Sequence, residues 1–472
     1  MKRIVRGISI GIILENKIKQ MRKTAKWVTA AMSTILVYTA SAQQRQQQPP
    51  LTLKAAIRQA LGSNRTLRAD SLGIAATGWQ NKELAGAFLP QVNYSSNIGY
   101  NLAIAKQMVP GAMVNQPSKE LVPVQFGTSY NMRTGVEVDQ LIYRKDLSVK
   151  IKAAGLYSNI ATTRYNLSRE ELVYQVAGAY YGLQSSNEMV ESTLRDYRNI
   201  DEVLQVAKAQ YESGTLKKID YQTLQINLAN KQSQLDQYRT QYSEQLAYFN
   251  YLLGLPADAA TALDSTSSNP NTLEPPTAET LNRFDIHLYR QMIQSKLVDL
   301  KSTDAERLPV VSSYFRYNVQ SNFNQLPKAF DGDYRYNASD IGVTVSVPLF
   351  DGNRRKSRQR ATSVELDQLL LKHMQLQDQA QMELVRTSQT FRNNKQQLSI
   401  TKDNLELAEK VFGSRKALYT QGVTTLIELL DAERELSQAR TNYTQAVINV
   451  QKGWMDVHKA NGTLLTNFIN TL

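Results

Sequence analysis

The chain lacks cysteine altogether, and its 472 residues include only three histidines and three tryptophans. The absence of cysteine excludes a disulfide-stapled scaffold, thiolate catalysis, cysteine-based zinc sites and lipid attachment at an N-terminal cysteine. The length allows two or three hydrophobic cores, and a hydrophobic content of 42% excludes intrinsic disorder. The fold must therefore be held together by packing.

Enzymatic motifs are also lacking. His287, His373 and His458 are far apart in the sequence and show no metal-ligand spacing. Neither a phosphate-binding glycine loop nor a nucleophile-elbow serine occurs. We interpret the three histidines as surface or helix-seam residues, and we expect no catalytic residue, metal site or cofactor.

Long apolar runs are missing beyond residue 42, which excludes helical transmembrane spans. Met21 is a second plausible start, followed by a basic stretch, an apolar stretch over residues 27–39 and an Ala40-Ser41-Ala42 cleavage motif. The apolar stretch is shorter than the ~18 residues that a membrane anchor needs. We predict that residues 1–42 are an N-terminal extension and signal peptide, so that a Gram-negative cell would export the chain to its periplasm or outer membrane.

The net charge of +13 comes largely from this predicted leader, which holds eight basic residues and one acid, Glu15. The remaining 430 residues contain 47 basic and 41 acidic side chains, and the two signs alternate along the chain. A nucleic-acid partner needs a dense basic patch. The sequence therefore predicts no nucleic-acid binding.

An internal repeat organises the mature chain. The segment from Tyr211 to Gly214 recurs 208 residues later as Tyr419 to Gly422, and the same offset relates Gly254 to Gly462. A Pro- and Ser-rich stretch separates the two copies. We divide the chain into a first repeat at 43–262, a linker at 263–276 and a second repeat at 277–472.

Each repeat contains apolar residues at a strict seven-residue spacing, which is typical of packed helices. A second such series follows each tip glycine, Gly214 or Gly422, so each repeat should contain an antiparallel helical hairpin with its tip there. The helix over about 353–420 lacks proline and could extend about 100 Å. A coiled-coil spacer or filament is the alternative for these helices alone. The first series is Val176, Leu183, Val190, Tyr197, Leu204 and Tyr211, and its counterpart is Leu384, Phe391, Leu398, Leu405, Phe412 and Tyr419.

Polar and apolar residues alternate in four other segments, which predicts strands with one apolar and one polar face. A sheet that covers a core would show the same alternation. However, Tyr and Phe recur on the apolar face, and Asn, Ser, Gly and Arg on the polar face, as in membrane barrels. The predicted strands are 91–102, 126–143, 310–320 and 340–350, and the loops 103–125 and 321–337 between them should face outside.

Four strands cannot close a barrel, because transmembrane barrels need about eight or more. Three chains with twelve strands are the economical solution. The predicted fold class is thus an α+β membrane protein, a trimeric 12-stranded β-barrel continued by a long α-helical coiled-coil barrel.

Two motifs reveal a family resemblance: Val345 to Gly352, which closes a strand and opens a long helix, and Tyr419 to Gly422, followed by Glu428 and Asp431. Over nearly all of the mature chain, the sequence resembles the TolC-type outer membrane efflux protein family. The resemblance implies a homotrimer in the outer membrane lipid. It would be a passive exit duct that meets an inner-membrane transporter through a periplasmic adaptor. A periplasmic coiled-coil adaptor or structural protein without a pore is the alternative, and it should lack the four strands.

The resemblance also implies functional residues at the hairpin tips. Gly214 and Gly422 allow a sharp helix reversal and would form the adaptor-docking tips. Tyr419 and Asp220 match a family gate latch in which a phenol donates to a carboxylate. A second family link uses an arginine where this chain has Thr424.

Glu428 and Asp431 are three residues apart and therefore share one helix face beyond the tip. In a trimer they would form two rings of three carboxylates, a selectivity filter at the periplasmic entrance that concentrates cations. The commoner meaning of such a stripe is a solvated acidic face. Arg434 could also neutralise Asp431 within the same helix.

Overall fold

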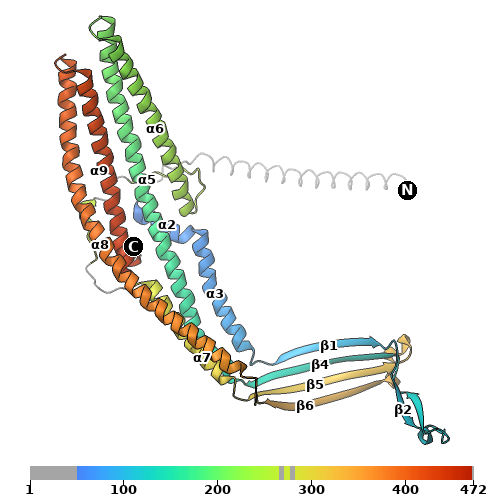
Figure 1. Cartoon of the computed structure of the whole chain (residues 1–472). Coiled ribbons are helices and arrows are strands. Elements are labelled where there is room, and N and C mark those ends of the chain that lie inside the picture. The colour runs from blue at the N-terminus through green and yellow to red at the C-terminus, as the bar shows by residue number, and fades with distance from the viewer. Residues whose placement is uncertain (1–49, 265–269, 277–281, 470–472) are drawn as a thin grey trace, which may run out of the picture.

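The computed structural model describes residues 50–264, 270–276 and 282–469, so the predicted signal peptide lies outside the described residues. The protein is elongated: long helices form a column, and a sheet extends from one end of it (Figure 1). The helices are α2 (Leu53–Ser63), α3 (Arg65–Gly86), α4 (Lys145–Lys152), α5 (Ala154–Glu212), α6 (Lys218–Leu252), α7 (Phe284–Ala305), α8 (Arg354–Thr420), α9 (Leu426–Asn461) and α10 (Leu464–Ile469). The strands are β1 (Gln91–Tyr100), β2 (Lys106–Pro110), β3 (Leu121–Gln125), β4 (Tyr130–Tyr143), β5 (Val310–Phe323) and β6 (Arg335–Ser346).

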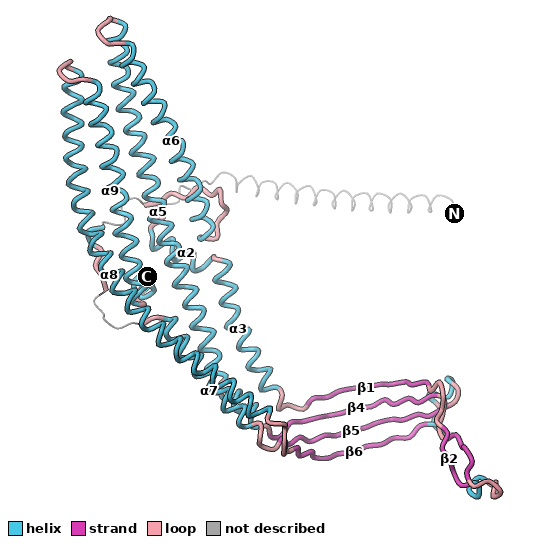
Figure 2. Tube along the Cα trace, viewed as in Figure 1, coloured by secondary structure: helices cyan, strands magenta, loops and turns pink. Residues whose placement is uncertain are grey.

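Two helical hairpins, α5–α6 and α8–α9, run to the end of the column opposite the sheet (Figure 2). Gly214 ends the first helix of one hairpin with φ +76°, and Gly422 ends that of the other with φ +75°. At each tip an amide beyond the glycine bonds back over the last turn: Thr215 N donates to Gln210 O, and Val423 N to Leu418 O, both at 2.9 Å. Both reversals thus use the left-handed glycine geometry expected from the sequence.

The other ends of α6 and α9 abut further helices. Gly254 and Gly462 have φ +72° and +76° and end α6 and α9 with the same bonding pattern as the tips. Helix α3 begins against the end of α6, where Ser63 Oγ donates to Leu253 O at 2.5 Å. Helix α7 begins against the end of α9, where Asn282 N donates to Asn461 O at 3.2 Å. Two shorter helices placed end to end thus flank each long helix.

Side-chain caps stabilise the first turns of α2, α3 and α9. Asn64 accepts a hydrogen bond from Leu67 N at the start of α3 and donates from Nδ2 to Leu252 O, so one side chain joins two helices. Thr52 and Thr425 cap α2 and α9 in the same way through their hydroxyl oxygens. Each cap satisfies an amide that the helix itself leaves unpaired.

The four main strands form one antiparallel sheet in the order β1-β4-β5-β6. Val92, Val138, Phe315 and Ile341 face one another across it and make a continuous apolar row. This apolar face is uncovered: Tyr94 is 73% and Ile341 81% exposed. The side chains lie on the outside of the sheet and cover no core within the chain.

The opposite face of the sheet is polar and charged. Glu137, Arg316 and Asp340 are cross-strand neighbours, and Arg316 Nε donates to Glu137 Oε1 at 2.6 Å. The Arg316 guanidinium also lies over the ring of Tyr314, which in turn lies against Gly342. A polar sheet face with glycines opposite large side chains agrees with the alternation in the sequence.

The strand ends differ from those expected. The strand predicted at 340–350 occupies Arg335–Ser346, because Pro348 has no amide to donate and the apolar residues after Ser346 leave the sheet. The predicted loop 103–125 contains the β2–β3 hairpin. Pro110 and Pro123 fall within these two strands, and proline is a weak strand signal that conceals such a hairpin.

The helical column is held by three apolar clusters. The largest surrounds Tyr180 and Phe249 where α2, α5, α6, α9 and α10 meet, another involves Phe391 and Val450 on α8 and α9, and the third contains Leu224 and other residues near the tips. The seven-residue series contribute to all three clusters. Among the described residues, no helix is long and apolar enough to cross a membrane.

Residues 263–264 and 270–276, which lie in the predicted linker, pack against segments that come before and after them in the chain. Leu263 pairs with Leu51 as an isolated bridge. Trp454 on α9 donates from Nε1 to Glu274 O at 2.9 Å, and Lys395 on α8 donates to Leu273 O at 3.1 Å. These described residues therefore bind to the middle of the helical column.

The junction between α9 and α7 should depend on glycine at position 462. A Cβ there would lie 2.3 Å from Asn282 O, and the left-handed φ adds strain. We expect Gly462→Ala to lower the free energy of unfolding by about 2 to 4 kcal/mol, measured by thermal unfolding of the helices.

Gly413→Ala is the matched control, because Gly413 lies inside α8 with nothing within 4 Å of its Cβ position. That change should stabilise the protein by about 0.5 to 1 kcal/mol. Equal effects at positions 413 and 462 would contradict the role assigned to the junction.

Candidate functional site

The hairpin tips are the first candidate site, because they are the end of the protein farthest from the sheet (Figure 1). A Cβ placed at Gly214 or Gly422 would have no heavy atom of the chain within 4 Å. Around the glycines, Ile219, Val423 and Ile427 are each 65% or more exposed. The tips thus combine a fixed backbone reversal with apolar side chains that nothing in the described chain covers.

Tyr419 lies behind its tip glycine in the apolar cluster with Leu224 and Leu429. It is 5% exposed, and its hydroxyl has no hydrogen-bond partner among the described residues. Burial raises the pKa of Tyr419, and the charge of Asp220 raises it further. Asp220 thus acts electrostatically on the phenol, but the donated bond expected for the latch is not formed within one chain.

Glu428 lies in the first turn of α9 and accepts bonds from two side chains. Arg415 Nη1 on α8 and Thr424 Oγ1 each approach Glu428 Oε2 to 2.5 Å. The Arg415 guanidinium also donates to Thr424 at 3.4 Å. An arginine from α8 therefore reaches the position where this chain carries Thr424 in place of the family arginine.

Asp431 lies one turn further along α9 and is about half exposed. Arg434 Nη2 donates to Asp431 Oδ1 at 2.8 Å, as the spacing of three residues allows. Both predicted ring carboxylates therefore have a basic partner in the same chain. Sequence reasoning considered Arg434 and missed Arg415, which is distant in sequence and meets Glu428 only because the hairpin closes.

The order of these elements, with strand pairs between long helical hairpins, is matched by known proteins. The family model for outer membrane efflux proteins aligns with residues 56–255 and 278–463. The chain belongs to the outer membrane efflux protein family. This membership confirms the resemblance drawn from the sequence and makes the chain a TolC-like protein of the outer membrane.

Individual relatives of this efflux protein are distant. Outer membrane protein TolC of Vibrio cholerae is 21% identical over 396 residues, covering 80% of this chain and 83% of the relative. The alkaline protease secretion protein AprF of Pseudomonas aeruginosa is 21% identical over 62% of each chain. The crystal structure of the Campylobacter jejuni CmeC outer membrane channel has the same fold, with a TM-score of 0.69, 15% identity and coverage of 87% and 86%. The relatives are channels of efflux pumps and secretion systems.

A buried charge network links the two hairpins of the efflux protein behind their tips. Asp196 on α5 accepts from Arg440 Nη1 on α9 at 2.6 Å. Lys231 on α6 lies 3.0 Å from Glu433 Oε1 on α9 and donates to Ser437 Oγ at 3.1 Å. Burial raises the pKa of Glu433, and the charge of Lys231 opposes the rise.

Sequence reasoning missed this network. Charged positions on heptad helices are usually solvated, but the side chains of Asp196 and Glu433 are only 4% and 10% exposed. The network depends on which face of α5–α6 meets α9, and that pairing is not visible in one helix. The sign alternation along each helix carries no signal for it.

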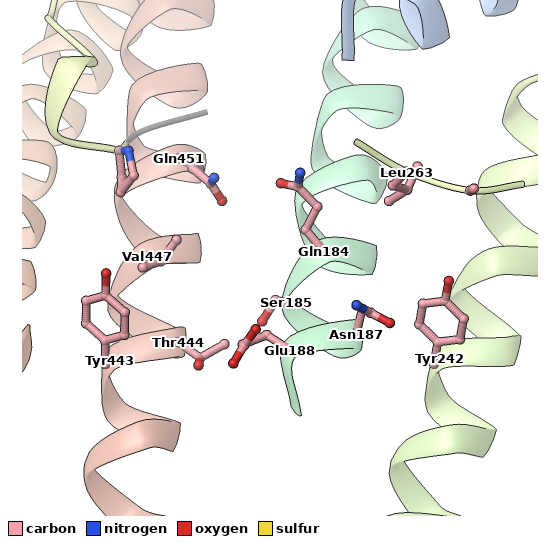
Figure 3. A pocket seen from close by; sticks show the side chains of 12 residues that line it. Gln184, Ser185, Asn187, Glu188, Tyr242, Leu263, Tyr443, Thr444, Val447 and Gln451 are labelled. Atoms are coloured by element: carbon pink, nitrogen blue, oxygen red, sulfur yellow. The ribbon is translucent and has the colours of Figure 1, made fainter. Parts of the chain in front are cut away.

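A cavity of about 520 Å³ lies between α5, α6 and α9 beside the linker (Figure 3). Tyr242 and Tyr443 flank it, and Gln184 and Glu188 project from α5 between them. Glu188 is bound by Arg195 at 2.6 Å, and Gln184 donates to Asp264 O at 2.8 Å. Polar groups of this kind show no arrangement for catalysis.

Two of the three histidines, His287 and His458, lie close to the α9–α7 junction. His458 is buried and bonds Thr463 at 2.8 Å, and its ring lies 4.4 Å from that of Trp454 at a tilt of 57°. His287 bonds Asn282 at 2.9 Å. Burial lowers the pKa of His458. The described residues contain no group of three or more His, Asp or Glu side chains that could hold a metal ion. The family is one of channels.

Removing Asp196 should be far more costly than removing an exposed acid of the same column. Asp196→Ala would leave Arg440 and Lys231 buried with one counter-charge fewer, and we expect a loss of about 3 to 5 kcal/mol in the free energy of unfolding. Chemical denaturation followed by circular dichroism measures it.

Asp236→Ala is the matched control, because Asp236 on α6 pairs with Arg239 at the surface, 59% exposed. We expect a change within about 0.5 kcal/mol. If Asp196→Ala and Asp236→Ala changed the free energy of unfolding equally, the buried network would contribute no more to stability than a surface ion pair.

Proposed function

We propose that the chain is one subunit of a homotrimeric exit duct in the outer membrane. Three four-stranded sheets join into a 12-stranded barrel, and the helical hairpins of the two repeats continue it as a tube through the periplasm. Substrates pass through passively from an inner-membrane transporter and its periplasmic adaptor. The cargo of the relatives ranges widely, so the chain's own substrate is selected by the transporter.

The sheet carries this proposal. Its apolar face is exposed, and β1 and β6 are its outer strands, each paired on one side within the chain. Apolar side chains and unpaired strand edges are both costly in water, and a closed barrel in lipid satisfies both. With 14 residues, β4 exceeds the roughly 9 to 11 that a tilted barrel strand needs to cross the membrane.

The helical column also presents an unpartnered surface. In the half of α8 nearer the sheet, five large apolar residues are more than half exposed and recur at helical spacing. Such a stripe supports packing against a neighbouring copy, since exposed patches of this kind mark interfaces. The five residues are Val364, Leu371, Met374, Met382 and Val385.

The tips then form the narrow periplasmic entrance. Gly214 and Gly422 meet the adaptor, and Tyr419 and Asp220 act as a latch when a small helix shift lets the phenol donate to the carboxylate. Glu428 and Asp431 form two acidic rings around the entrance. Each carboxylate has an arginine partner in its own chain, so the rings attract cations with a strength that Arg415 and Arg434 reduce.

Planar-bilayer recording tests the duct and its filter together. The purified protein should insert as a trimeric pore that prefers cations and is blocked by multivalent cations from the periplasmic side. Combining Glu428→Gln with Asp431→Asn should remove both properties, because the rings lose their charge. Arg434→Gln, which frees Asp431, should strengthen the cation preference.

Two results would contradict these claims separately. A monomer that is soluble without detergent and forms no pore would overturn the duct. If the cation selectivity and the block were unchanged by the double substitution, the duct proposal would stand, but Glu428 and Asp431 would be ordinary surface charges and not a filter.

The docking role of the tip is tested by Gly422→Trp, which should abolish efflux in cells while leaving insertion in the outer membrane intact. The Cβ of the new side chain would have no heavy atom of its own chain within 4 Å. Loss of efflux would then report a blocked partner.

Gly422→Asn is the control for backbone strain, since asparagine tolerates the left-handed region and adds little bulk. We expect it to retain most efflux. Unchanged efflux in the tryptophan variant would refute docking at this tip.

A further inference from the structure

Glu170 on α5 is a buried acid with no role in the proposed entrance or in the barrel. It is 7% exposed, and its Oε1 has no hydrogen-bond partner among the described residues. It lies in the middle of the column, near the place where α9 ends and α7 begins. A buried polar atom without a partner is costly, so its surroundings require a physical account.

The charged groups around Glu170 already satisfy one another. Arg283, the residue just before α7, binds Asp285 and also Glu383 of α8, both at 2.7 Å. On α9, Lys459 binds Glu171 at 2.8 Å. These two bases thus already pair with three other acids, and Glu170 is a fourth acid without a base of its own.

Asn461, the last residue of α9, is a second unsatisfied group at this junction. It is fully buried, and both its Oδ1 and its Nδ2 lack partners in the described chain. Helices α5 and α9 are antiparallel, with Tyr174 bound to Asp456 at 2.7 Å and Glu171 to Lys459. The same register brings Asn461 level with the turn of α5 that contains Glu170.

We propose that Glu170 is a proton-binding site and that, once protonated, it pairs with Asn461 and tightens the α9–α7 junction. The carboxyl takes one proton from solvent, and its new O–H donates to Asn461 Oδ1. Asn461 Nδ2 donates to the other carboxyl oxygen. When the proton leaves, Oδ1 loses its donor and a charge remains in the buried junction.

The direction of the effect follows from the same surroundings. Burial raises the pKa of Glu170 to about 7; Asp285 and Glu171 reinforce the rise, whereas Lys459 and Arg283 oppose it. A raised folded-state pKa means that the stabilisation is complete below the unfolded value of 4.5 and is lost as pH rises through about 7. Mild acid should therefore tighten the junction, and mild alkali should loosen it.

Hydrogen exchange on the purified full-length protein tests the proposal. After correction for intrinsic rates, segments 282–290 and 455–462 should be protected at about pH 5.5 and lose about tenfold in protection at about pH 8.5. Glu170→Gln keeps a hydrogen-bonding amide at every pH, so it should hold the protected state at both values. Glu191→Gln, on the exposed surface of α5, should retain the wild-type response.

The Asn461→Leu variant tests the pairing of Glu170 with Asn461 separately from the protonation of Glu170. It should reduce protection at about pH 5.5 to the level of the alkaline state, because the protonated carboxyl has lost its partner. The proton site would be overturned if protection in the wild-type protein did not change with pH, or if it still changed in Glu170→Gln. The pairing with Asn461 would be overturned if protection in Asn461→Leu changed with pH as fully as in the wild type. No transport is measured, so failure here is distinguishable from failure of the duct.

Discussion

The architecture depends on helices that meet end to end. Helices α3 and α6 have 22 and 35 residues, α7 and α9 have 22 and 36, and each pair runs beside one continuous helix of 59 or 67 residues. For two helices to meet end to end, the first must end sharply, and its last carbonyl oxygens must remain accessible to donors at the start of the second. Gly254 and Gly462 do both, because their left-handed backbone turns the chain away within one residue. Without that abutment the long helices would lack a partner over part of their length.

The two abutments are built from different chemistry. At the α6–α3 junction, Ser63 and Asn64 donate to carbonyls at the end of α6, and the polar groups are satisfied. At the α9–α7 junction, Glu170 and Asn461 remain unsatisfied amid ion pairs. The two junctions therefore differ, because the buried polar side chains have partners at one of them and lack partners at the other.

Ion pairs join neighbouring helices at two levels of the column. The Asp196–Arg440 pair behind the tips joins α5 to α9, and Arg283 near the middle joins α7 to α8. Two apolar clusters lie between these levels and the third lies nearer the tips, and together they supply the packing energy. A buried ion pair adds little net stability, but breaking it leaves an uncompensated charge, so such pairs disfavour any other helix register.

Local sequence patterns determined much of this protein. Seven-residue spacing predicted the long helices, Gly214 and Gly422 marked both reversals, and alternation located the four main strands, since each is a property of neighbouring residues. Proline concealed the β2–β3 hairpin and blurred the end of β6, where local signals conflict. Only the tertiary structure brought Arg415 to Glu428, buried Asp196 and placed Asn461 at the level of Glu170. Those relations join residues far apart in sequence, and they depend on which helix faces meet, which no single helix encodes.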